Sequence, residues 1–160
     1  MAFPRARQTP TTDPVNALLS FGYALLTNKV ASVVQLVGFD HEVGYPHRSF
    51  YARPALALDR VEEFRPLIVD AVVLALLNRQ MLTREDFLVE LEASRLKDQQ
   101  RKLFFTQLEL RLNEPIIPPL SGYRTSYRRC LELQARLLAK TVTGEIDTYP
   151  PFLIRYGEFW

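Results

Sequence analysis

Thiols are nearly absent from this sequence, because Cys130 is the only cysteine among 160 residues. A lone cysteine excludes an internal disulfide and a zinc site built from several cysteines, and it fits a reducing compartment. An excess of one charge is also lacking, since 20 Lys and Arg against 18 Asp and Glu give a net charge of +2. Overall charge therefore does not indicate a nucleic-acid-binding protein, and such a function must come from where basic residues gather.

Long apolar runs are missing as well. The longest, residues 17–27 and 67–77, are broken by polar residues or glycine and are shorter than the roughly 20 residues of a membrane-spanning helix. The N-terminal residues lack the apolar segment of a secretory signal. Apolar residues nevertheless make up 48% of the chain, which favours one folded domain. We therefore expect a cytoplasmic protein with no membrane partner.

Several catalytic signatures are also absent. The chain has no Gly-rich phosphate loop, no His-Glu-x-x-His zinc motif and no Gly-x-Ser-x-Gly nucleophile elbow. It likewise lacks the Glu-x-x-His pair of carboxylate-bridged di-iron bundles. These absences direct attention to residues with less familiar spacing.

Helical periodicity dominates what is present, and predicts a single all-α domain of about five to seven helices. Weak alternation near residues 87–92 predicts one short hairpin, preceded by a capping pattern that starts at Thr83. The first helix, capped by Asp13 and opened by Pro14, is apolar on nearly every side and should be buried all round. We predict a basic linker over 1–12, a helical domain over 13–145, a C-terminal tail over 146–160, and main helices over 14–37, 55–78, 98–113 and 121–143.

The second of these helices carries acids and an internal proline. Asp59, Glu62 and Pro66 share one face, while Val61 and Phe64 point toward the core. A proline inside a helix removes one N–H and frees the carbonyl four residues earlier, here that of Glu62. The helix should therefore kink or loosen at Pro66.

One of only two histidines, His47, precedes that helix in a loop. An imidazole nitrogen together with the carboxylates of Asp59 and Glu62 would suit Mg²⁺ or Mn²⁺, which could activate a hydroxyl against a phosphate ester. The alternative is an ordinary solvated helix face beside a surface histidine. Spacing alone does not decide between these interpretations.

Basic residues form a second pattern. Arg129, Arg136 and Lys140 share a narrow face of the last helix, away from a stripe predicted to contain Tyr123, Tyr127, Cys130, Leu131, Leu137 and Leu138. They could line a track for DNA phosphates, or they could simply solvate the helix. Arg65 could contact phosphate, or pair with an acid, either Glu62 or one elsewhere in the core. The further candidates for phosphate contact are Arg5, Arg7, Arg48 and Arg53.

Three segments together resemble the C-terminal helical domain of the CRISPR-associated integrase and endonuclease of spacer acquisition. They are TDPVNALLSFGYALL (12–26), GFDHEVGYPH through ALALDRVEEFRPLIVD (38–70) and YRRCLELQARLLAKTVTGE (127–145). The resemblance implies that His47 and Glu62 bind a divalent ion, with Asp59 as a second acid beside them. It implies an enzyme that joins the 3′-hydroxyls of a short prespacer duplex to the CRISPR repeat by transesterification and also cuts branched DNA.

The resemblance also implies partners, and it shows where this sequence differs from the family pattern. Family members form homodimers that a small ferredoxin-like protein bridges, and they carry an N-terminal β-domain and a third ligand, a glutamate, upstream of the first helix of this chain. Neither is present in the 160 residues, so we expect the C-terminal helical catalytic domain only, inactive by itself. The alternatives are a non-catalytic helical module for DNA binding or assembly, and a general helical protein-interaction domain.

Overall fold

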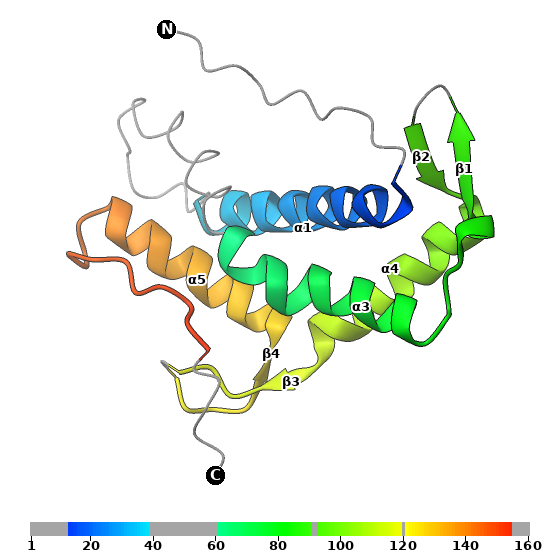
Figure 1. Ribbon diagram of the computed structural model, residues 1–160. Coiled ribbons are helices and arrows are strands. Elements are labelled where there is room, and N and C mark those ends of the chain that lie inside the picture. The colour runs from blue at the N-terminus through cyan, green and yellow to red at the C-terminus, as the bar shows by residue number, and fades with distance from the viewer. Residues whose placement is uncertain (1–12, 39–60, 91–92, 120, 155–160) are drawn as a thin grey trace, which may run out of the picture.

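The computed structural model describes residues 13–38, 61–90, 93–119 and 121–154. This part of the chain is mostly helical with two short strand pairs, which confirms the all-α prediction. Figure 1 shows α1 lying across the other helices, with α5 toward one end of the molecule and α3 and α4 toward the other. The main helices are α1 (Pro14–Gly38), α3 (Ala71–Asn78), α4 (Asp98–Asn113) and α5 (Tyr127–Val142).

Helix α1 begins at the predicted capping signal. The Asp13 carboxylate accepts hydrogen bonds from the backbone N–H groups of Val15 and Asn16, both at 3.3 Å, and Pro14 takes the first helical position. By length and composition alone, residues 14–37 could cross a membrane, as the core helices of globular proteins often could. Here α1 packs against α5, α3 and β2, so it serves as a packing element of the domain.

The prediction that α1 is buried on every side is wrong. Among the described residues, its partners bury one stripe fully and leave the other faces half-buried or exposed. The buried stripe runs at four-residue spacing through Leu18, Gly22, Leu26 and Val30.

Pro66 changes the helix that contains it. Residues 61–65 are helical, Pro66–Asp70 form the π-helix η1, and α3 follows directly. The proline ring excludes an α-helical hydrogen bond to the carbonyl of Glu62, so the backbone widens into a π turn. The predicted loosening at Pro66 is confirmed.

Arg111 of α4 supports this wider turn from outside the helix. Its Nε donates to the backbone carbonyl of Leu67 at 2.8 Å, and its guanidinium lies 4.7 Å from the centre of the Tyr127 ring. Arg111 also forms an ion pair with Glu114. One side chain thereby ties η1 to α4 and to the start of α5.

The predicted capping pattern and hairpin are both present. Thr83 and Asp86 form a capping box in which the Thr83 N–H donates to the Asp86 carboxylate at 2.7 Å. The hairpin that follows is antiparallel and places the buried Phe87 opposite the buried Leu96. The elements are the 3₁₀-helix η2 (Arg84–Asp86) and the strands β1 (Phe87–Glu90) and β2 (Ala93–Leu96).

Helix α4 has the predicted bounds, whereas α5 starts later than predicted. Its N-cap is Ser126, whose hydroxyl accepts from the Arg129 N–H at 3.3 Å, and not a residue near Ser121. The residues before Ser126 instead form β4 (Thr125–Ser126), which pairs with β3 (Pro115–Ile116). Tyr123 is consequently 78% exposed and does not belong to the buried stripe of α5.

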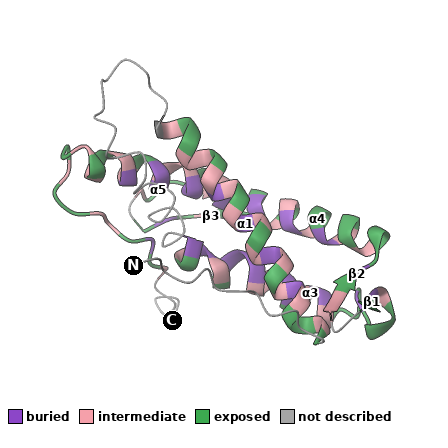
Figure 2. Cartoon of the chain, turned by 90° about the horizontal axis from the view of Figure 1, so that it is seen from above, coloured by how far each residue is buried: buried purple, intermediate pink, exposed green. Residues whose placement is uncertain are grey.

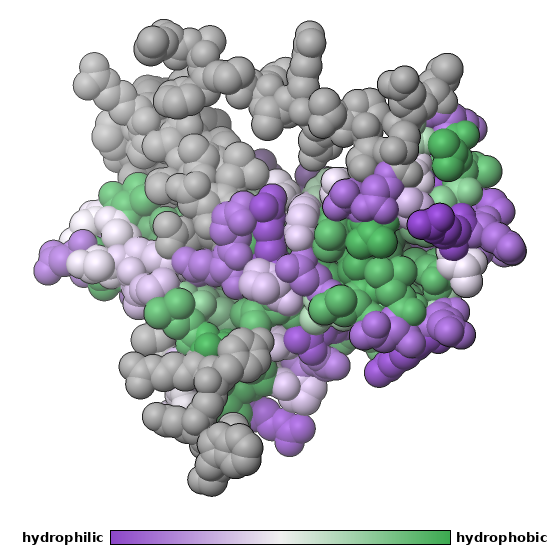
Figure 3. All heavy atoms as spheres, viewed as in Figure 1, coloured by the Kyte–Doolittle hydropathy of each residue, from purple (hydrophilic) through white to green (hydrophobic). Residues whose placement is uncertain are grey.

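The core lies where the helices face one another, as the buried residues in Figure 2 show. At its centre α1 approaches η1 and α4 very closely. A Cβ added to Gly22 would lie 2.5 Å from Val69 Cγ1 and 3.0 Å from Phe104 Cζ. Figure 3 shows hydrophobic residues also at the surface over α3 and the start of α1, where Leu74 and Val15 are exposed.

Candidate metal and DNA site around Glu62

Most residues of the sequence-predicted site lie outside the described residues. This applies to the ligand His47 and its companion Asp59, and to the phosphate-contact candidates Arg5, Arg7, Arg48 and Arg53. The described members are Glu62, Arg65, Arg129, Arg136 and Lys140.

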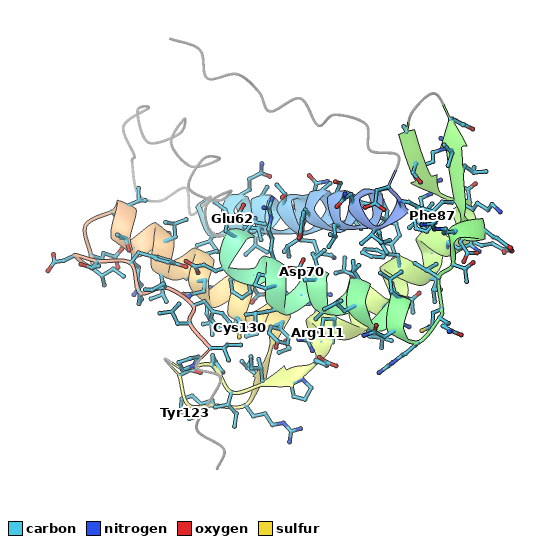
Figure 4. The ribbon with its side chains drawn as sticks, viewed as in Figure 1. Glu62, Asp70, Phe87, Arg111, Tyr123 and Cys130 are labelled. Atoms are coloured by element: carbon cyan, nitrogen blue, oxygen red, sulfur yellow. The ribbon has the colours of Figure 1, made fainter. Side chains whose placement is uncertain are left out.

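Glu62 lies on the helical turn of residues 61–65, here called the Glu62 turn, close to the C-terminal half of α1 (Figure 4). Its neighbours Val61 and Phe64 are buried, as predicted, whereas the Glu62 side chain is 61% exposed. Its Oε1 accepts an ion pair from Arg65 Nη1 at 2.7 Å. A solvent-facing carboxylate is thus held on a turn whose other face is fixed in the core.

Arg65 connects Glu62 to helix α1. Its guanidinium lies 4.3 Å from the centre of the Tyr23 ring, and the Tyr23 hydroxyl donates to Asp70 Oδ1 at 2.6 Å. The buried Arg65 Nε has no hydrogen-bond partner among the residues that the structure describes. Of the two roles predicted for Arg65, pairing with Glu62 is confirmed, and contact with phosphate stays a prediction.

Tyr23 is electrostatically perturbed by this arrangement. Burial, and then the hydrogen bond to Asp70, raises the pKa of Tyr23 from its usual value of 10.0 to about 12. The hydroxyl therefore remains a donor to Asp70 throughout the neutral range. Sequence reasoning missed Tyr23 and Asp70, whose contact joins α1 to η1 across 47 residues.

The next residue of the turn, Glu63, faces a different partner. Its Oε2 accepts from the Tyr149 hydroxyl at 3.2 Å and from the Phe152 backbone N–H at 3.1 Å. The rings of Phe64 and Phe152 stack with their centres 4.6 Å apart. Sequence reasoning missed this contact too, because no periodicity relates residues nearly 90 positions apart.

The basic residues of α5 occupy the predicted face. Arg129, Arg136 and Lys140 are all exposed, on the opposite side from the buried Leu131 and Leu138. Arg129 pairs with Glu132, and Lys140 lies 3.7 Å from Glu145. Exposed pairs of this kind are weak, about 0–1 kcal/mol, so they leave these cations available to a phosphate.

A second charge cluster ties three helices together. Glu109 of α4 pairs with Lys29 of α1 at 2.6 Å and with Arg128 of α5. The hydrogen bond from Lys29 is the largest of the effects that lower the pKa of the Glu109 carboxyl, and both cations add to it. This cluster links α4 to both α1 and α5, which also pack directly against each other.

The described residues alone do not form a complete metal site. Within 13–38, 61–90, 93–119 and 121–154, no group of three His, Cys, Asp or Glu side chains is placed to hold an ion. Glu62 is thus one ligand of the predicted set, and the other ligands would have to come from elsewhere in the chain or from beyond it.

Comparison with known proteins relates these features to a family. A sequence model described as "CRISPR associated protein Cas1" matches residues 1–110. Two relatives are CRISPR-associated endonuclease Cas1 3 of Thermus thermophilus, 44% identical, and a CRISPR-associated exonuclease Cas4/endonuclease Cas1 fusion of Geobacter sulfurreducens, 43% identical. Both matches cover 96% of this chain, but they cover 46% and 27% of the relatives.

Comparison with solved structures leads to the same family as the sequence matches. A Cas1 protein from Thermotoga maritima superposes with a TM-score of 0.69 at 29% identity, over 86% of this chain and 42% of that one. A casposase bound to its integration product gives a TM-score of 0.72 at 26% identity, over 91% and 40%. The chain thus spans less than half the length of these proteins. Its helical fold and its sequence place it in the CRISPR-associated Cas1 family, to which it belongs.

Proposed function

We propose that this chain is the C-terminal helical domain of a metal-dependent DNA endonuclease and integrase that inserts new spacers into CRISPR arrays. The observation that carries the proposal is Glu62, an exposed carboxylate on a turn anchored in the core, in a chain of the Cas1 family. The reaction would be attack of the 3′-hydroxyls of a prespacer duplex on phosphodiesters of the CRISPR repeat.

Glu62 fits a hard divalent cation. Carboxylate oxygens are ligands that Mg²⁺ and Mn²⁺ prefer, and the Glu62 carboxylate is open to solvent on one side. We propose that His47 and Glu62 hold the ion, with Asp59 beside them and a glutamate upstream of this chain as the third ligand. A bound divalent ion would supply Lewis acidity at a phosphate oxygen and would activate the attacking hydroxyl.

The residues around Glu62 would orient its carboxylate and neutralise the negative charge of the DNA phosphates. Arg65 holds Glu62 Oε1 and stacks on Tyr23, so it limits the rotamers open to Glu62 and places a positive charge beside the substrate phosphate. Phosphate contacts along the duplex position DNA without reading its sequence. We propose that they come from Arg5, Arg7, Arg48, Arg53, Arg65, Arg129, Arg136 and Lys140.

The partners follow from the same proposal. The casposase of similar fold is bound to its integration product, which supports double-stranded DNA as the ligand of this chain. We propose that the whole protein is a cytoplasmic homodimer that works with a small ferredoxin-like adaptation subunit.

The test is strand transfer by the full-length protein in Mn²⁺ or Mg²⁺, using a short duplex and a repeat-containing plasmid. Glu62→Gln and His47→Ala should each reduce product by roughly 100-fold or more, because even residues behind metal ligands commonly cost 10- to 100-fold. Glu85→Gln, at an exposed acid of η2, serves as the control and should leave transfer unchanged. Full activity in both site variants would refute the proposal.

A second function is supported by one observation, the exposed basic face of α5 formed by Arg129, Arg136 and Lys140. A non-catalytic module for DNA binding or assembly would bind DNA with strong salt dependence and show no metal-dependent chemistry. Metal-dependent cleavage of branched DNA by the purified 160-residue chain would exclude this alternative.

A further inference from the structure

A short segment near the C-terminus lies across the Glu62 turn. Residues 149–152, here called the C-terminal strap, contact the turn through Tyr149 and Phe152. The carboxylate of Glu63 accepts from both of them, at 3.2 Å from the Tyr149 hydroxyl and 3.1 Å from the Phe152 N–H. The Phe152 ring also stacks on Phe64, with an interplanar angle of 22°.

The strap is itself anchored in the domain. Phe152 is only 6% exposed and belongs to the hydrophobic core, whereas the next residue, Leu153, faces solvent. The buried Gln134 of α5 donates to the Pro150 carbonyl at 3.4 Å. Two consecutive prolines restrict the backbone of the strap, so little conformational freedom is lost when it docks.

The Glu62 turn benefits from such support because one backbone hydrogen bond to the next helix is missing. Pro66 has no N–H to donate to the Glu62 carbonyl, and the π-helix η1 starts there. Side-chain contacts therefore add to the backbone in fixing the orientation of the turn about its own axis. Successive residues of a helix are about 100° apart, so a rotation that moves Glu63 moves Glu62 equally.

Two side chains hold the turn from opposite directions. Glu63 and Arg65 are two positions apart, about 200° around the helix axis. Glu63 is fixed by the C-terminal strap, and Arg65 is fixed by Tyr23 of α1. Glu62 lies between them in sequence, and its exposed carboxylate has fewer constraints of its own.

We propose that the C-terminal strap positions Glu62, with Tyr149 and Phe152 acting through Glu63 and Phe64. This inference rests on the proposed role of Glu62 as a metal ligand. The strap contacts the far side of the same turn, so its residues are positioning residues and not ligands. The state of the C-terminus is thereby coupled to the geometry of the metal site.

The experiment combines a conservative variant series with two readouts. Tyr149→Phe and Glu63→Gln each weaken the hydrogen bonding between the strap and the Glu62 turn without creating a cavity in the core. Tyr123→Phe makes the same change at an exposed tyrosine and serves as a matched control. The readouts are hydrogen exchange of the amides of residues 61–70 and Mn²⁺ affinity measured by electron paramagnetic resonance, both in the full-length protein.

The expected result is faster exchange and weaker binding in the strap variants. Each should raise exchange over residues 61–70 and lower Mn²⁺ affinity by roughly 3- to 10-fold, because only part of the free energy of one hydrogen bond to a charged acceptor is transmitted to Glu62. The double variant should lose little more than Glu63→Gln alone, since the bond that Tyr149→Phe removes is one of the two that Glu63 accepts. Tyr123→Phe should match the natural protein in both readouts.

Glu62→Gln, measured alongside, separates the two proposals. Unchanged Mn²⁺ affinity in Glu62→Gln overturns the proposed function. Weakened affinity in Glu62→Gln, together with natural affinity and natural exchange in Tyr149→Phe, overturns the positioning role alone.

Discussion

Replacing Gly22 by alanine is the sharpest test of the packing that supports the site. The added Cβ would lie 2.5 Å from Val69 Cγ1 and 3.0 Å from Phe104 Cζ. Both neighbours are fully buried, so neither can move without displacing η1 or α4. Overpacking of this kind costs about 1–3 kcal/mol, whereas alanine in place of glycine inside a helix gains about 1 kcal/mol.

We therefore expect Gly22→Ala to destabilise the domain by up to about 2 kcal/mol, the overpacking cost less the gain in helix propensity. Urea denaturation followed by circular dichroism should show a lower midpoint with an unchanged slope. Ser20→Ala, at an exposed position of the same helix, isolates the propensity term and should be neutral or slightly stabilising.

Val69→Ala removes the atom in closest contact. Combined with Gly22→Ala, it should give a domain more stable than the sum of the two single changes predicts, by about 1 kcal/mol or more, because the residues share one contact. A Gly22→Ala variant at least as stable as Ser20→Ala would show that α1 and η1 do not approach as closely as described.

Two pH dependences follow from the charged contacts. The pKa of Tyr23 is raised to about 12 in the folded state, so its stabilising contribution is complete below pH 10 and is lost as pH rises through 12. The urea midpoint should therefore fall less between pH 9 and pH 11.5 in Tyr23→Phe than in the natural protein. The pKa of Glu109 is lowered by its lysine and arginine partners, so its contribution is present above the usual value of 4.5 and is lost as pH falls below it. Glu109→Gln should be less stable at pH 6 yet lose less stability between pH 6 and pH 3; an equal loss in both proteins would contradict the assignment.

Local chemistry in the sequence predicted several elements correctly. Pro115 ends α4 at the predicted residue, and the Thr83 capping box begins η2. The loosening at Pro66 was predictable because a missing N–H has the same effect in any helix. These features depend on a few neighbouring residues and not on the rest of the fold.

Features that depend on distant residues were not predictable. Ser121 resembles a helix start, but Gly122 lies in a turn with a φ of 65°. Pairing of β4 with β3 then keeps Thr125 and Ser126 extended and delays α5 until Tyr127. Likewise, periodicity shows that α1 is apolar, but only the placement of its partners decides which stripe is buried.

The candidate site divides in the same way. Glu62 was identified as a candidate ligand from a family resemblance, because short-range spacing alone gave only weak support for a metal site. The contacts that hold it, from Tyr23 and Tyr149 to Arg65 and Glu63, span more than 40 residues each and leave no local pattern. His47 and Asp59 lie outside the described residues, so their part of the prediction stays a prediction.

The π turn at Pro66–Asp70 fixes the number of residues that this part of the helix can contain. It contains one residue more than an α-helical path would need, and Leu67, Ile68 and Val69 are all buried within it. Deleting one of the residues 67–70 would remove the extra residue of the π turn and rotate everything before it by about 100° relative to α3. Such a rotation would turn Glu62 from solvent and bring Phe64 out of the core. Point substitutions in this stretch should be tolerated far better than a change of one residue in its length.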